Sequence, residues 1–451
     1  MRIISRSFSQ IQRVYGFIRE SFWAIPCGLM LLGIILIVVN IWIDTQYSPS
    51  FSPDFSALFN FDDFTGIRTL LSTTAAAILG VAGVSFSITI ASLTLASQQF
   101  GPRLIRTFVR NRFIQMVLGL FVATFLYCIV TLQLGSILNS EHYRPLFTMA
   151  TVLSLILINL ITLVLFIHHI CIVLQADSVV NEVVLEMKER AEILFEADNT
   201  DHAPDDEDAL SVFATSFEYY DTSLCAEKNG YITFIDYDRL LQLASEHNVY
   251  ANVLHRAGDY VLQAESLMLL NGENTNEPCF NESSKFIVIE DARTPEQDLE
   301  YTIRQLVEIA LRALSPGIND PFTAMNCIEQ LGSLLHYVGQ RKKPNRLMQD
   351  ENGDVRLLAN FASYQSLVEA SFNQIRQTSK GHVDVSIRLL EILAKVVKLD
   401  ENETQAKHIR TQAELVMKAA LTQDFIDYDM AAVTERYEAF CAHYSDQFGH
   451  K

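Results

Sequence analysis

The stretch that decides the fold is Ser72–Gln99, STTAAAILGVAGVSFSITIASLTLASQQ, which contains no charged side chain. It is longer than the roughly 20 residues that a helix needs to cross a bilayer. Two stripes at steps of three and four residues run along opposite sides of such a helix. One stripe is small: Ala76, Gly80, Gly83, Ser87 and Ala91. The other is mostly hydroxylated: Ser85, Thr89, Ser92, Ala96 and Gln99.

Each stripe predicts a different contact. Small residues let helix backbones approach closely in a membrane. The residues that we therefore assign to helix packing are Ala76, Gly80, Gly83 and Ser87. A hydroxylated edge suits other helices or water better than acyl chains, and the candidate pore-lining residues are Ser85, Thr89, Ser92 and Gln99. In the alternative interpretation these hydroxyls bond to their own backbone and the helix is a tightly packed centre.

Apolar blocks of sufficient length occur four times in the chain. The expected spans are Phe22–Ile43, Leu70–Ala96, Ile114–Leu138 and Phe147–Leu174. Arginines cluster before the first span and after the second, whereas the other two loops carry only Arg68 and Arg144. By the positive-inside rule both termini are cytoplasmic. The sequence thus predicts an α-helical membrane protein with four transmembrane helices.

The charge of the chain is divided unequally. Residues 1–174 hold ten Arg, no Lys and six Asp or Glu, a net charge of +4, and the total of −19 leaves −23 for residues 175–451. An acidic half of this kind repels the phosphates of nucleic acid. We therefore exclude nucleic acid as a partner and expect membrane lipid instead.

A basic segment follows the second span. Arg103, Arg106 and Arg110 alternate with apolar residues, so the arginines share one side of a helix. This spacing predicts a short helix at the lipid headgroups, or a positively charged vestibule at the mouth of a pore. The alternative is ordinary charge that sets the membrane topology.

Residues that could carry chemistry are few. His168, His169 and Cys171 end the fourth span, but adjacent histidines point about 100° apart on a helix and no third ligand is evident. The cysteines form no C-x-x-C pair, and no Walker loop, dinucleotide fingerprint or H-E-x-x-H motif is present. We assign no catalytic residue, no metal site and no cofactor, and the sequence disfavours an enzyme.

Beyond the spans the apolar pattern changes. The expected division is a cytoplasmic N-terminal segment (1–21), a four-helix transmembrane domain (22–174), a helical extension with an acidic linker (175–228), a small α+β domain (229–290) and a cytoplasmic helical domain (291–451). Strands over 231–235 and 250–254 should flank a helix over 238–247. Apolar spacing predicts a bundle of helices over 361–378, 383–399, 403–421 and 426–444.

The helical domain opens with a stretch rich in helix signals. Thr294–Gln297 (TPEQ) predicts a capping box that begins a helix ending near Leu314. Charged residues repeat every four positions along this helix and predict a ladder of ion pairs: Arg304, Glu308 and Arg312.

A corner with a distinctive composition follows this helix. Asp320 is the expected N-cap of the next helix, with Pro321 at its first position. Gly317 and Asn319 precede them. Such a turn either binds an anion through free backbone N–H groups or is a stiff connection between two helices.

Several stretches together resemble one bacterial family. They are SFSITIASLTLASQQFGPRLIRTFVRNR, the HHI that ends the fourth span, GYITFID, HRAGDYV and RTPEQDLEYTIRQLVEIALRALSPGINDPFTA. They resemble the predicted membrane proteins known as domain of unknown function 2254, and the resemblance covers nearly the whole chain. It implies a bacterial inner-membrane location and this same architecture. It implies no activity, so no functional residue is transferred.

Two functions of different class fit these observations. The first is an oligomeric channel or pore for ions, in which copies of the second span surround the axis and the cytoplasmic domain sets the open probability. The second is a non-conducting scaffold or relay, in which the hydroxylated stripe packs within one protomer. We expect a homo-oligomer in the first case.

Overall fold

The computed structural model describes nine segments and a few isolated positions between 213 and 220. The segments are 23–47, 64–101, 111–137, 146–173, 175–195, 222–272, 283–341, 344–399 and 402–449. The chain divides into two compact units, Met1–Ser178 and Val179–Lys451.

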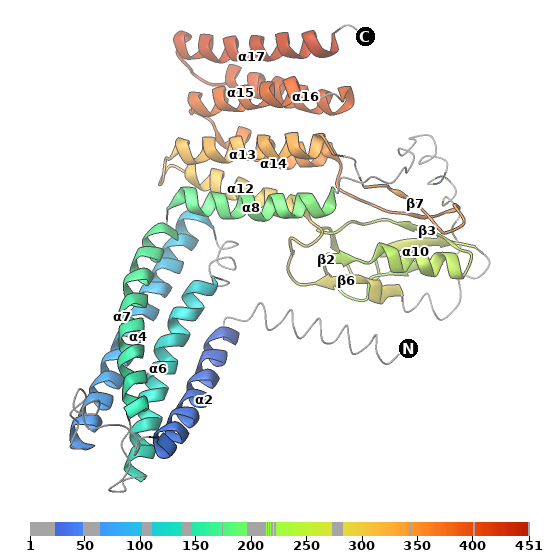
Figure 1. The fold of residues 1–451 in the computed structure, drawn as a ribbon. Coiled ribbons are helices and arrows are strands. Elements are labelled where there is room, and N and C mark those ends of the chain that lie inside the picture. The colour runs from blue at the N-terminus through green and yellow to red at the C-terminus, as the bar shows by residue number, and fades with distance from the viewer. Residues whose placement is uncertain are drawn as a thin grey trace. The chain divides into compact units, whose positions relative to one another are not determined.

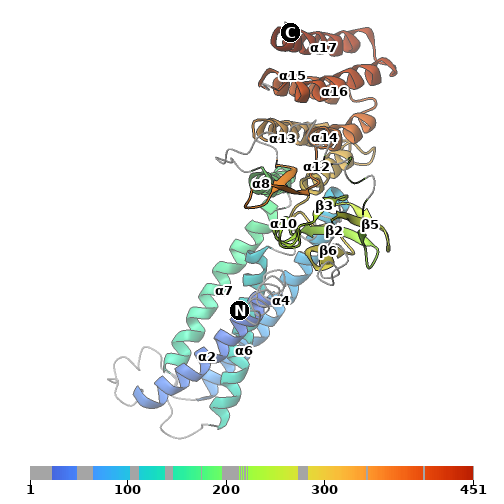
Figure 2. The same ribbon diagram turned by 90° about the vertical axis from the view of Figure 1, so that its right-hand side faces the viewer.

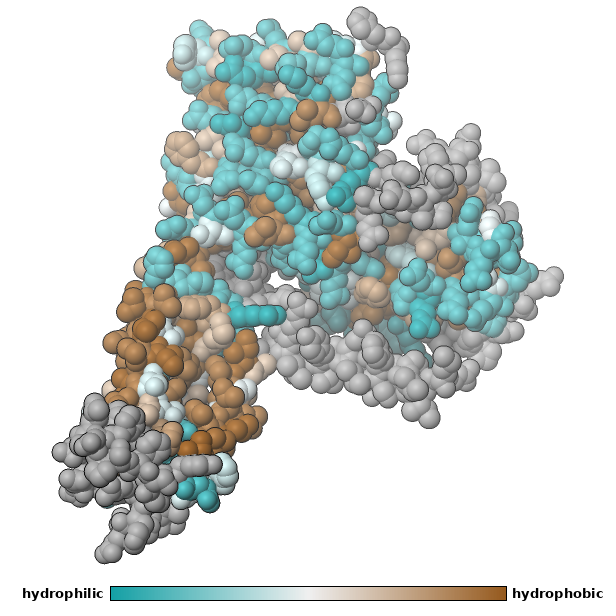
Figure 3. Space-filling view, viewed as in Figure 1, coloured by the Kyte–Doolittle hydropathy of each residue, from teal (hydrophilic) through white to brown (hydrophobic). Residues whose placement is uncertain are grey.

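The described part of the first unit contains four long apolar helices (Figure 1). They are α2 (Ala24–Tyr47), α4 (Phe64–Phe100), α6 (Arg112–Ile137) and α7 (Leu146–Val173). Each is long and apolar enough to cross a membrane, which agrees with the four predicted spans. The face of these helices that Figure 3 shows is predominantly hydrophobic, as its brown atoms indicate.

Helix α6 is the centre of this unit. In the most apolar part of α6, 56% of the residues are buried, whereas the corresponding share is 17% or less in each of the other three helices. Gly119 makes the contact with α2 close, since a Cβ at this position would lie 2.8 Å from Cα of Pro26. Phe121 and Tyr127 of α6 are almost fully buried. The other helices therefore pack around α6, and α4 presents one face to it and one face outward.

Among the described residues, the second unit holds all but the first three residues of α8 (Ala176–Leu194) and two sheets. The five-stranded sheet has the order β1 (Thr222–Cys225), β5 (Ser266–Asn271), β3 (Tyr250–Val253), β8 (Val355–Leu358), β7 (Leu347–Gln349). The three-stranded sheet has the order β4 (Tyr260–Val261), β2 (Gly230–Ile235), β6 (Ile287–Glu290). Helix α10 (Tyr237–Glu246) follows β2, and a short 3-10 helix, η3 (Ser283–Phe286), precedes β6.

The sheets agree with part of the sequence prediction and extend it. The expected strands and helix correspond to β2, β3 and α10. The sheet also takes strands from outside 229–290, because β1 precedes this range and β8 pairs in parallel with β3, joining Ala251 to Leu357. Antiparallel neighbours flank this parallel pair, β5 beside β3 and β7 beside β8.

The remaining helices form successive layers, which Figure 2 shows from the side. They are α12 (Leu299–Ala313), α13 (Pro321–Gly339), α14 (Tyr364–Thr378), α15 (Val383–Leu399), α16 (Glu403–Leu421) and α17 (Asp427–Phe448). The four predicted bundle helices are all present, as α14 to α17. The predicted start of α12 is wrong: Asp298, whose side chain accepts from the amide of Tyr301, is the N-cap in place of Thr294.

Candidate functional site

The hydroxylated edge of α4 faces its own protomer. Ser85 is 1% exposed and Ala96 is also buried, while Thr89 and Ser92 are partly buried and Gln99 is exposed. The hydroxyl of Thr89 donates to the backbone oxygen of Ser85 at 2.8 Å. Four of the five edge residues therefore lie on the packed side of α4, and the hydroxyl of Thr89 is bonded within its own helix.

The small stripe of α4 faces outward in the described protomer. Ala76, Gly80, Gly83, Ser87 and Ala91 are all exposed. A Cβ added to Gly80 or Gly83 would meet no atom within 4 Å. The hydroxyl of Ser87 donates to the backbone oxygen of Gly83 at 2.9 Å, as the interpretation with self-bonded hydroxyls expects.

Hydroxyls also extend this outward face toward both ends of α4. Thr73 and Thr94 are exposed and lie at helical spacing from Gly80 and Ser87. Their hydroxyls donate to the backbone oxygens four residues earlier, at 2.7 and 2.9 Å. The outward face is thus small and hydroxylated over most of the span, and we call Thr73, Ala76, Gly80, Gly83, Ser87, Ala91 and Thr94 the small face of α4.

The sequence analysis did not identify the polar side chains that bond to one another inside the first unit. Asn40 donates to the hydroxyls of Tyr127 and Thr151, each at 2.9 Å. Asp44 accepts from the amides of Phe147 and Thr148, and so caps α7 from the end of α2. Isolated Asn and Asp residues within apolar blocks were the available signal, because buried polar groups in a span need partners.

Two further polar pairs lie in this unit. Asn159 of α7 donates to the hydroxyl of Thr124 in α6 at 2.8 Å. Asn111 lies 3.1 Å from Nε2 of His169, whose ring also packs on Phe113. Among the described residues, no three His, Cys, Asp or Glu side chains are grouped so that they could hold a metal ion.

The basic segment with Arg103, Arg106 and Arg110 lies outside the described residues. The corner between α12 and α13 is described. Asn319 has a φ of 51°, and the amides of Ile318, Asn319 and Asp320 donate to the carbonyls of Ser315, Ser315 and Ala313. These amides are therefore engaged within the turn, and this favours the stiff connection over an anion site.

The next helix begins as predicted. Asp320 accepts from the amide and the hydroxyl of Thr323, and Pro321 is the first helical residue. Gly317 is open on its Cβ side. In α12, ion pairs join charged residues four positions apart: Arg304 with Glu300 at 3.5 Å, and Arg312 with Glu308 at 3.4 Å.

Two of the family-like stretches meet in the second unit. Arg256, in HRAGDYV, donates through Nη2 to Oε1 of Glu300, in RTPEQDLEY, at 2.7 Å. A second hydrogen bond joins Nη1 of Arg256 to Oγ of Ser366 in α14 at 3.2 Å. Gly258 has a φ of +95°, and a Cβ there would collide with Asp298. Glycine is therefore required for the two stretches to approach.

Further contacts hold the start of α12 against the sheet. Arg293 donates from Nε to Oδ2 of Asp298 at 2.8 Å. The side chain of Gln297 accepts from the amide of Ile235 at 2.8 Å and donates to its carbonyl at 3.0 Å. We call Arg256, Arg293, Gln297, Asp298 and Glu300 the clasp. Sequence reasoning used Gln297 only as part of a capping box, because a single sequence does not show which distant residues meet.

The pKa values of the two carboxyl groups in the clasp are shifted in opposite directions. Burial by itself raises the pKa of Glu300, but the charge of Arg256, together with hydrogen bonds from Ser366 and Arg256, brings that pKa below its ordinary value. For Asp298 burial is the larger effect, so its pKa is raised in spite of Arg293. The adjoining cavity measures about 60 Å³, and within the clasp Arg256 pairs with Glu300 and Arg293 with Asp298.

The comparisons with known proteins agree with this architecture. A family model described as a predicted membrane protein (DUF2254) matches residues 19–395. Uncharacterized proteins of Mycobacterium bovis and Mycobacterium tuberculosis are 28% identical over 377 residues, which cover 81% of this chain and 70% of theirs. No solved structure matches the chain. The chain therefore belongs to the DUF2254 family of predicted membrane proteins.

Proposed function

We propose that this membrane protein is a homo-oligomeric, non-conducting scaffold or signal relay whose copies meet through the small face of α4. The observation that carries the proposal is the exposure of this face on the side of α4 opposite to its packed edge. Small residues permit two helix backbones to approach closely, and in lipid this close packing drives helix association.

The surroundings of the small face support the same conclusion. Large apolar side chains flank it, among them Leu79, which is 54% exposed, Val84 and Leu95. These side chains suit lipid, whereas the strip between them offers acyl chains little to contact. A second helix fits a strip of small residues bordered by large ones.

Cross-linking tests the proposal directly. We expect a cysteine at Gly80 or Ser87 to form a disulfide between copies in membranes, and a cysteine at Leu79 to form far less. The unmodified chain measures the background from native cysteines. In detergent, Gly80→Leu with Gly83→Leu should yield monomers without unfolding, because both positions are exposed and a Cβ at either one meets no atom within 4 Å. Leu79→Phe is the matched control and should stay oligomeric.

A conducting pore is the second candidate, and the hydroxyls of Thr73, Ser87 and Thr94 on the small face favour it. The lining first expected, Ser85, Thr89 and Ser92, lies on the packed side of a single protomer. This placement is why we rank the scaffold first. Ion flux into proteoliposomes that disappears in Ser87→Leu but persists in Leu79→Phe would reverse that order.

We further propose a bacterial inner-membrane location with both termini in the cytoplasm, on the strength of the family and of the arginines before α2 and after α4. A C-terminal alkaline phosphatase fusion should be inactive and a C-terminal green fluorescent protein fusion should fluoresce. The opposite pair of results would contradict this orientation. Lipid is the expected partner of the outer surfaces of α2, α4 and α7.

A further inference from the structure

The turn between α12 and α13 exposes two large apolar side chains. Phe322 is 78% exposed and Ile318 is 44% exposed. Three neighbours in the turn, Pro316, Gly317 and Asn319, are also exposed, and none of the five residues carries a charge. We call these five residues the uncharged corner. Single exposed apolar side chains are common on proteins, but a group of them indicates a surface that contacts an apolar partner.

The uncharged corner is stiff. The amides of Ile318, Asn319 and Asp320 donate to carbonyls within the turn. The carboxylate of Asp320 accepts from the amide and the hydroxyl of Thr323, and Pro321 fixes the backbone at the first position of α13. The exposed side chains are therefore carried by a fixed backbone before any contact is made, so a partner pays little conformational entropy to bind them.

Contacts at the far end of α12 fix the direction of α8. Leu194, the last residue of α8, lines the same small cavity as Leu299, the first residue of α12. The carbonyl of Phe195 accepts from Nη1 of Arg341, which follows α13, at 2.9 Å. Helix α8 therefore ends where α12 begins and where α13 ends, and it lies alongside α12 in Figures 1 and 2.

The start of α8 consequently lies toward the uncharged corner. With 19 residues α8 is about 28 Å long, whereas the 15 residues of α12 cover about 22 Å, so α8 reaches the end of α12 at which the corner lies. Val179 and Val180, in the first turns of α8, are buried. Span α7 ends at Val173 and α8 begins at Ala176. The end of the second unit that carries the corner is thus continuous in the chain with a membrane span.

We propose that the uncharged corner binds the lipid surface, with Ile318 and Phe322 inserted at the level of the headgroups and the first acyl carbons. Continuity with α7 makes lipid the apolar partner nearest to hand. Phenylalanine and aliphatic side chains are the residues that enter this layer in proteins that lie on a membrane. An uncharged corner is not repelled by lipid phosphates, although the second half of the chain is acidic. The inference does not depend on oligomerisation through α4, since lipid contact is measured at a single residue.

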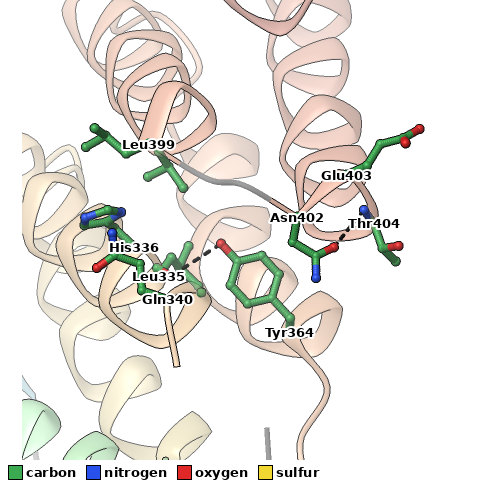
Figure 4. A pocket seen from close by; sticks show the side chains of 10 residues that line it. Leu335, His336, Gln340, Tyr364, Leu399, Asn402, Glu403 and Thr404 are labelled. Atoms are coloured by element: carbon green, nitrogen blue, oxygen red, sulfur yellow. Dashed lines mark hydrogen bonds between the residues drawn. The ribbon is translucent and has the colours of Figure 1, made fainter. Parts of the chain in front are cut away.

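A matched exposed aromatic residue lies at the same edge of the helical layers. The end of α13, the start of α14, the end of α15 and the start of α16 surround a cavity of about 670 Å³, shown in Figure 4 with Leu335, Tyr364, Leu399 and Asn402. The uncharged corner and the turn between α16 and α17 therefore lie at the opposite ends of these helices. Tyr428, in the first turn of α17, is 82% exposed. Because α15 lies between α13 and α17, Tyr428 is farther from α8 than the uncharged corner is.

Photo-cross-linking of the full chain in phosphatidylcholine vesicles tests the proposal. Phe322→p-benzoylphenylalanine keeps an aromatic ring at the exposed position. After irradiation we expect lipid adducts on the peptide that contains residue 322, measured by mass spectrometry. Tyr428→p-benzoylphenylalanine is the control and should give about ten-fold less lipid adduct. Equal yields at the two positions, or cross-links from residue 322 to a second copy in place of lipid, would overturn the proposal.

Salt and a second labelled position complete the test. The yield at residue 322 should be unchanged at about 1 M salt, where charges are screened beyond about 3 Å, because the contact is apolar. Loss of the adduct in salt would mean that charge attraction holds the second unit to lipid and would refute the insertion. Ile318→p-benzoylphenylalanine should also give lipid adducts, and it replaces the first variant if that one fails to fold. Absence of lipid adducts at both 318 and 322 in folded protein refutes the assignment.

Discussion

Replacing Glu300 by Gln tests the clasp, because it keeps the shape of the side chain and removes its charge. Glu300 is only 7% exposed, and its carboxylate accepts from Arg256 at 2.7 Å. Removing one member of a buried ion pair destabilises a protein by about 3–5 kcal/mol. Arg256 is 24% exposed and keeps Ser366 and Asp259 as partners, so we expect a loss of about 2–3 kcal/mol.

The dependence on pH gives the prediction a second readout. The pKa of Glu300 is lower in the folded chain than its ordinary value of 4.5. The stabilisation is therefore fully present above about pH 4.5 and is lost as the pH falls through the folded pKa. The gap between the parent chain and Glu300→Gln should accordingly be widest near neutral pH and close in acid.

Thermal unfolding in detergent, followed by intrinsic fluorescence at pH 7 and below pH 4, measures both effects. A loss of 2–3 kcal/mol corresponds to a fall in Tm of roughly 4–12 °C for a unit of this size. Glu308→Gln is the matched control in the same helix: its partner Arg312 is 3.4 Å away and 35% exposed, so the loss should be below about 1 kcal/mol. Equal falls in Tm for the two variants, or a gap that does not change with pH, would refute the reasoning.

Three further substitutions test packing and caps by the same measurement. Gly332→Ala places a methyl group against Ile392 in the core between α13 and α15. It should lower the free energy of unfolding by about 1–3 kcal/mol. An unchanged stability would mean that the two helices can move apart without loss. Asp320→Ala removes the N-cap of α13 and should cost about 1 kcal/mol, with Asp320→Asn nearly neutral; equal losses would argue against a capping role. Asp44→Ala removes the cap of α7 and should lower the free energy of unfolding by about 0.5–2 kcal/mol. Asp44→Asn should restore part of this loss. Unchanged stability in Asp44→Ala would show that water replaces the carboxylate.

Local chemistry explains what could be predicted. The four spans could be predicted because the length and apolar composition of a segment do not depend on the rest of the fold. The N-cap at Asp320 and the proline after it were predictable because a cap forms between residues three positions apart. By the same logic Thr294 was a reasonable N-cap, yet Asp298 serves instead.

The difference arises from contacts distant in the sequence. Gln297 bridges the amide and carbonyl of Ile235, and Arg293 contacts Asp298, so the residues before Leu299 are held against the sheet and cannot enter α12. In the same way, β8 finds its place beside β3 across more than a hundred residues of chain. No pattern within either segment specifies its partner.

For this protein the sequence by itself determined the membrane class, the number of spans and the two stripes of α4, because hydrophobic length and helical spacing are properties of single segments. Only the tertiary structure decided which stripe is covered. Helices α6 and α7 pack against α4, and Ser85 is buried while Gly80 and Gly83 remain on the outside. Periodicity shows that a helix has two faces, but the side that is buried depends on which helix packs against it.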